Sequence, residues 1–154
     1  MLHRIQKMVR GIWRRLPVGL RIRVARSTQP KFTVSATAII VNPANEVLLL
    51  EHVFRPSCAW ALPGGFLNAR ESAEEAVVRE VREETSLGLE NVRIYFARTD
   101  RTHVEIFFIA DPTGEPRVNS HEIMDFRWFK KEDLPAGMSK TQRRLIEQVL
   151  DGRV

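Results

Sequence analysis

The 154-residue sequence contains a single cysteine, Cys58, so an intramolecular disulfide is impossible. This composition fits a reducing compartment, and we expect the protein to be cytoplasmic. Nothing in the neighbouring sequence indicates an activated nucleophile, so we interpret Cys58 as an ordinary loop thiol. The sequence also lacks the apolar run of roughly 20 residues that crosses a bilayer. Arginines interrupt the N-terminal region, where a secretory signal would be continuously apolar.

Acidic residues are absent from the first 45 positions. Glu46 is the first acid, and nine of the 24 Lys and Arg residues precede it, so the other 15 face all 19 acids. The net charge of +5 therefore comes from the N-terminal segment, while the rest of the chain is slightly acidic. We predict a basic amphipathic segment over residues 1–30 and one globular domain over residues 31–154.

Apolar residues recur at helical spacing in the basic segment "MLHRIQKMVRGIWRRL", whereas "LRIRVAR" fits a strand or a short helix. The favoured role of this segment is packing against the domain or against a partner subunit in a homodimer. Attachment to an anionic membrane surface is the second possibility, and contact with RNA phosphates is the third. A cleaved organelle-targeting peptide also fits an Arg-rich, acid-free segment.

The remaining sequence predicts alternating strands and helices. "FTVSATAIIV", "EVLLLEHV", "NVRIYFAR", "THVEIFFIA" and "DFRWF" are predicted strands, and "FRPSCAWALPGGF" is a predicted loop. "SAEEAVVREVREETS" is the clearest helix, because Ser72 suits the N-cap and Glu75 completes a capping box. "SKTQRRLIEQVL" is predicted as a second amphipathic helix. This pattern predicts an α/β (α+β) fold, namely an α/β/α sandwich with a mixed β-sheet.

Three glutamates of the first of these helices lie on one face. Glu80, Glu83 and Glu84 are spaced i, i+3, i+4, and their arc continues the apolar side that Ala76 and Val77 occupy. Like charges at i,i+4 destabilise a helix by roughly 0.2–0.5 kcal/mol per pair. No lysine or arginine lies on that arc, so we expect a divalent cation to compensate the acids. Oxygen ligands without His or Cys favour Mg²⁺, with Mn²⁺ as a second possibility.

Residues 65–87 resemble the Nudix box, Gly-x5-Glu-x7-Arg-Glu-apolar-x-Glu-Glu-x-Gly-apolar. The matching residues are Gly65, Glu71, Arg79, Glu80, Val81, Glu83, Glu84 and Leu87. Ser86 stands where the pattern has its late glycine. Because that glycine ends the helix in a left-handed conformation, a serine should cost around 1 kcal/mol, and Gly88 is the candidate to take over the turn.

The resemblance implies a Mg²⁺-dependent pyrophosphohydrolase of Nudix fold that cleaves a diphosphate linkage in a nucleoside diphosphate derivative. It implies that the metal ligands are Glu80, Glu83, Glu84 and the Gly65 carbonyl. It further implies an ion pair between Glu71 and Arg79 that orients the preceding loop against the helix.

Family members often add an acid from a later loop, and the candidates are Asp100, Glu105, Glu115 and Glu122. We prefer Glu122, which precedes a strand in "HEIMDFRWF". Glu105 lies inside a predicted strand, where an outward-facing side chain is the plainer interpretation. Glu83 and Glu122 are the two candidates for the general base.

The sequence indicates the substrate contacts only weakly. Arg55 or Arg70 could hold a phosphate, and Phe66 could stack on a base. The histidines lack ligand spacing, so we interpret His52, His103 and His121 as structural. The alternative function is a nucleotide- or RNA-binding module of Nudix fold without hydrolysis. The complete carboxylate set favours the enzyme, because a pure binder has no need of it.

Overall fold

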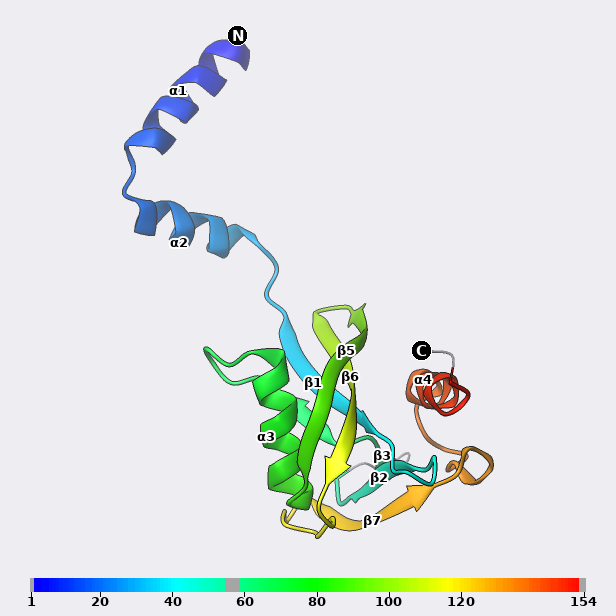
Figure 1. Cartoon of the computed structure of the whole chain (residues 1–154). Coiled ribbons are helices and arrows are strands. Elements are labelled where there is room, and N and C mark those ends of the chain that lie inside the picture. Colours follow the sequence, from blue (N-terminus) through cyan, green and yellow to red (C-terminus); the bar gives the residue numbers. More distant parts are fainter. Residues whose placement is uncertain (1, 55–58, 153–154) are drawn as a thin grey trace. The chain divides into compact units, whose positions relative to one another are not determined.

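The computed structural model describes residues 2–54 and 59–152. The chain divides into two compact units, Met1–Lys31 and Phe32–Val154. The first unit contains helices α1 (Leu2–Arg15) and α2 (Val18–Thr28) (Figure 1). "LRIRVAR" is therefore helical. Pro17 starts α2, since its carbonyl accepts hydrogen bonds from the N–H groups of Leu20 (3.0 Å) and Arg21 (3.1 Å). Among the described residues, no helix is long and apolar enough to cross a membrane.

The second unit contains two β-sheets within the described residues. The first sheet has the order β4 (Gly64–Phe66), β1 (Thr33–Ile40), β6 (His103–Thr113), β5 (Gly88–Asp100). Its β1–β6 pair is parallel and its other pairs are antiparallel, so this sheet is mixed. The second sheet is antiparallel, with the order β3 (Trp60–Ala61), β2 (Val47–His52), β7 (Ile123–Phe129).

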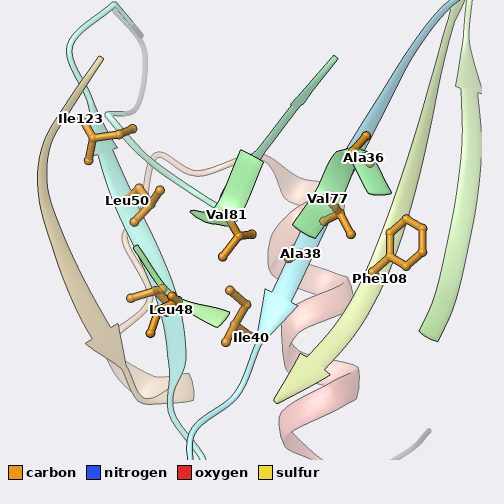
Figure 2. Close-up of a cluster of buried hydrophobic side chains, with 11 residues drawn as sticks. Ala36, Ala38, Ile40, Leu48, Leu50, Val77, Val81, Phe108 and Ile123 are labelled. Atoms are coloured by element: carbon orange, nitrogen blue, oxygen red, sulfur yellow. The ribbon is translucent and has the colours of Figure 1, made fainter. Parts of the chain in front are cut away.

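Helix α3 (Ala73–Thr85) packs in one apolar cluster and helix α4 (Lys140–Leu150) in another. The strands contribute side chains to both clusters. Side chains alternate along each strand. In β2, Leu48 and Leu50 therefore join the cluster of α3, whereas Val47 and Leu49 join that of α4. Figure 2 shows Val77 and Val81 of α3 among the strand side chains. Burial on both faces explains the continuous apolar runs, and the predicted α/β/α sandwich with a mixed sheet is confirmed.

The prediction of a loop over residues 54–66 is wrong in part. Two short strands lie within it, and β4 pairs antiparallel with β1 through Ser35–Phe66 and Thr37–Gly64. Two and three residues are too few to show strand periodicity, which is why the sequence pattern missed them. Arg55 and Cys58 belong to the same segment but lie outside the described residues.

Helix α3 begins as predicted and ends differently. The capping box is present, since the N–H of Glu75 donates to Ser72 Oγ (3.2 Å) and the N–H of Ser72 donates to Glu75 Oε2 (2.8 Å). At the other end Ser86 itself adopts the left-handed conformation (φ 60°) and donates its N–H to the Arg82 carbonyl (2.9 Å). The expectation that Gly88 takes over this turn is wrong. Gly88 opens β5, where a Cβ would collide with Thr113 Oγ1.

Replacing Ser86 with glycine should stabilise the protein by about 0.5–1 kcal/mol, because glycine adopts the left-handed conformation without strain. Urea unfolding at neutral pH measures this change. Ser139→Gly is the matched control, since that serine has φ −52° and glycine there should bring no gain. Equal or lower stability of Ser86→Gly would show that the helix end stores no strain.

Candidate active site

A cleft of about 580 Å³ lies in the second unit and gathers four carboxylates from three parts of the fold. Glu80 and Glu84 come from α3, Glu105 comes from β6, and Glu122 precedes β7. Gly64 and Gly65 of β4, with side chains from β1 and α4, complete part of the lining. Residues far apart in the sequence thus form one acidic depression.

The Gly64–Gly65 pair lets the backbone approach the α3 carboxylates. The N–H of Gly64 donates to Glu84 Oε2 (3.0 Å), and Glu84 is only 8% exposed. Gly64 has φ 142°, and a Cβ there would overlap the Ala36 carbonyl oxygen. A Cβ on Gly65 would overlap the carboxylate of Glu80. Gly64 therefore requires glycine because the overlap is with backbone, whereas a side chain at Gly65 would displace the Glu80 carboxylate.

Arg79 binds three glutamates at once. Its guanidinium forms a two-pronged ion pair with Glu71 (Nε–Oε1 2.7 Å, Nη2–Oε2 3.0 Å). Its Nη1 donates to Glu80 Oε1 (2.8 Å) and to Glu83 Oε2 (3.3 Å), and its Nη2 donates to the Phe66 carbonyl (3.1 Å). No lysine or arginine lies on the arc of the three acids, yet the long Arg79 side chain reaches around the helix to Glu80 and Glu83.

Glu83 lies apart from the other two glutamates of the helix. At about 100° per residue, Glu84 is roughly 40° from Glu80 on one side, whereas Glu83 is roughly 60° from it on the other. The Glu83 side chain is 61% exposed. It lines a second groove together with Arg79 and Arg82, and it is not among the described residues that line the cleft. Glu80 and Glu84 therefore share the cleft, whereas Glu83 lies outside its lining and is linked to Glu80 only through Arg79 Nη1.

Glu105 belongs to the cleft, so the interpretation of its side chain as an outward-facing strand residue is wrong. The side chain is 12% exposed and pairs with Arg98 (Nη2–Oε2 2.7 Å, Nε–Oε2 2.8 Å). It also accepts a hydrogen bond from Thr37 Oγ1 (3.4 Å). Strand alternation puts Glu105 on the same face of β6 as Phe107, the face toward α4. Arg98 extends this link to α4 by donating to Thr141 Oγ1 (3.0 Å).

His103 also lines the cleft, which its interpretation as a structural residue did not anticipate. Its Nδ1 lies 2.8 Å from Thr33 Oγ1 and its Nε2 lies 3.0 Å from Ser35 Oγ. Its ring packs edge-on against Phe66, with ring centroids 5.6 Å apart. The hydroxyl partners lie 70 and 68 positions away, so no local spacing could have indicated this arrangement.

The other candidates are distributed around the unit. Phe66 is exposed. Phe66 and His52 both line the cleft. Several exposed candidates are not among the described residues of this lining: Arg70, Asp100, Glu115 and His121. Arg55 lies outside the described residues.

The cleft's donor set fits a hard divalent cation. Carboxylates and a nearby backbone carbonyl are the ligands that Mg²⁺ and Mn²⁺ prefer, and Gly65 has no side chain to separate its backbone from Glu80. Within the described residues, no three acidic, His or Cys side chains are already close enough to hold a metal ion. Instead Arg79 holds Glu80, Gly64 holds Glu84 and Arg98 holds Glu105.

The family model for the NUDIX domain matches residues 31–149 of this chain. The chain belongs to this family, and the family membership predicted from residues 65–87 is confirmed. Its fold is similar to the crystal structure of a MutT NUDIX hydrolase from Burkholderia pseudomallei. The two share 32% identity over 79% of this chain and 98% of that chain, with a TM-score of 0.66.

Two curated relatives carry names that specify an activity. An NAD-capped RNA hydrolase, NudC, from Vibrio parahaemolyticus is 31% identical over 117 residues, which are 73% of this chain and 45% of NudC. A putative 8-oxo-dGTP diphosphatase from Bacillus subtilis is 29% identical over 124 residues, 79% of this chain and 82% of that protein. The chain thus spans less than half the length of the NudC relative.

The contacts of Arg79 make a prediction about pH. The hydrogen bonds from Arg79, followed by that from the Asn68 N–H, lower the pKa of Glu71 from 4.5 to about 2. A depressed carboxyl pKa contributes stability above pH 4.5 that is lost as the pH falls toward 2. Carbon-13 NMR titration of the Glu71 carboxyl should show a midpoint near 2, and Arg79→Gln should move it toward 4.5. A midpoint near 4.5 in the unaltered protein would contradict the ion pair.

Proposed function

We propose that the protein is a pyrophosphohydrolase that uses Mg²⁺, or Mn²⁺, to cleave a diphosphate linkage in a nucleoside diphosphate derivative. The observation that carries this proposal is the cleft in which Glu80 and Glu84 of the Nudix helix meet Gly65, Glu105 and Glu122. The named activities of the relatives support the class of substrate, since both names specify nucleotide derivatives. The single cysteine agrees with a cytoplasmic site of action.

We assign the metal ligands to the side of α3 that faces the cleft. Glu80, Glu84 and the Gly65 carbonyl would hold the cation, which when bound neutralises phosphate charge and lowers the pKa of a water molecule. Glu83, the third ligand that the family pattern implies, lies in the other groove beside Arg79. We therefore assign it to holding Arg79 in place.

Glu122 is the proposed general base. A base must reach the attacking water, and Glu122 lines the cleft from the loop before β7. Glu83 is the other candidate, but its carboxylate points to the Arg79 groove. Glu71 and Arg79 are proposed to act indirectly, since their ion pair fixes the loop between β4, which carries Gly65, and α3, which carries Glu80.

The substrate's base is proposed to lie against Phe66. This ring is exposed at the cleft and is braced edge-on by His103, and an aromatic face supports stacking. Arg55 and Arg70 remain candidates for phosphate contacts. Arg70 is exposed and has φ 72° in the loop before α3.

Glu84→Gln should lower turnover by at least about 100-fold, a barrier increase of about 2.7 kcal/mol. The substitution keeps the shape of the side chain but removes the charge of a metal ligand. Hydrolysis of a panel of nucleoside diphosphate derivatives, with Mg²⁺ and with excess chelator, measures this effect. Glu74→Gln is the matched control on the exposed side of the helix. Glu83→Gln should reduce turnover less than Glu84→Gln does.

Two outcomes would oppose this account. Full activity in excess chelator would remove the metal from the mechanism. Tight nucleotide binding without turnover by the unaltered protein, with Mg²⁺ present, would favour the binding module instead.

A further inference from the structure

We propose that helices α1 and α2 attach the protein to the surface of an anionic lipid bilayer. The contact would use the first compact unit, residues 1–31. It would leave the carboxylate cleft of the second unit to its own chemistry, so it does not depend on the proposed function.

The charge of this unit is of one sign. Nine Lys and Arg residues stand before the first acid of the chain. Four of those in α1 have described, exposed side chains, namely Lys7, Arg10, Arg14 and Arg15. Without acids to pair with, these cations are complementary to anionic headgroups, which attract basic segments near a membrane surface.

Apolar side chains decide between a membrane and a nucleic acid. Of the twelve large apolar side chains that are exposed on the described residues, five lie between positions 13 and 24. They are 38–62% exposed: Trp13, Val18, Leu20, Ile22 and Val24. Helix α2 has no buried residue. Phosphate binding needs the cations but gains nothing from exposed aliphatic groups, whereas an interfacial helix also buries one apolar side, which Val18 and Ile22 offer at i,i+4 spacing in α2.

The length and pattern of α1 indicate how it would lie. Its 14 residues extend about 21 Å, less than the roughly 30 Å of a hydrocarbon core. At helical spacing, the sequence has apolar residues at positions 2, 5, 9 and 13 along one side of α1, while the basic residues at positions 7, 10 and 14 lie along another. Such a helix lies in the plane of the interface, with its basic stripe at the headgroups.

Co-sedimentation of the full chain with vesicles tests the proposal. Vesicles of phosphatidylcholine with about one-third phosphatidylglycerol should bind the protein, and vesicles of phosphatidylcholine alone should bind it at least about 10-fold more weakly. High salt should weaken the anionic binding, because exposed charges are screened. Absence of binding, or equal binding to both vesicles, would overturn the proposal.

Charge-reversed variants locate the contact. Arg10→Glu combined with Arg14→Glu should reduce vesicle affinity at least about 10-fold. Arg93→Glu combined with Arg117→Glu makes the same change of charge at exposed positions of the second unit, and it should alter affinity less than about 2-fold. An equal loss in both double variants would show that only net charge matters and would overturn the proposal.

Apolar variants separate a membrane from the other partners. Val18→Ser combined with Ile22→Ser should reduce vesicle affinity several-fold while leaving affinity for a single-stranded RNA oligonucleotide unchanged. The control is Ile94→Ser combined with Met124→Ser, both exposed in the second unit. Unchanged vesicle binding in the α2 variant would overturn the proposal. The proposal would also be overturned if the unaltered chain did not bind vesicles and instead formed a dimer that dissociates in the α2 variant. Sedimentation velocity would detect that dimer.

Discussion

The arrangement of the carboxylates depends on one guanidinium. Arg79 joins Glu71 in the loop before α3 to Glu80 and Glu83 on the helix, and it also binds the Phe66 carbonyl in β4. Acids crowded into one helical turn need a nearby positive charge. Because Arg79 supplies that charge from the same helix, it offsets the repulsion between Glu80 and Glu83, and it links the loop, strand and helix around the cleft to one another.

Packing places this helix where its acids can act. Val77 and Val81 bury one face of α3 against both sheets, and the capping box and the left-handed Ser86 set its two ends. The neighbouring β4 is only three residues long, yet it pairs with β1 and brings Gly64 and Gly65 against the carboxylates. The apolar layer thus determines the position of the helix, and the glycines determine how closely backbone and acids approach.

The sequence predicted the features that local patterns carry. The capping box, the strands of the core and the i,i+4 pair of Glu80 and Glu84 depend on neighbours within one or two turns. Features that depend on distant partners were missed. Glu105 reaches the cleft through its pairing with Arg98 across the β5–β6 hairpin, and His103 through hydroxyls of β1. The contacts of Arg79 with Glu80 and Glu83 were missed because a helical wheel shows directions but not the reach of a long side chain.

The central claim is that a divalent cation binds in the cleft at Glu80 and Glu84 while Arg79 keeps its ion pair with Glu71. Anomalous scattering from a crystal of the protein soaked in Mn²⁺ tests it most directly. The account predicts a Mn²⁺ peak in the cleft, in contact with Glu80 and Glu84, with Arg79 still bound to Glu71. A peak in the groove at Glu83, with none in the cleft, would contradict it.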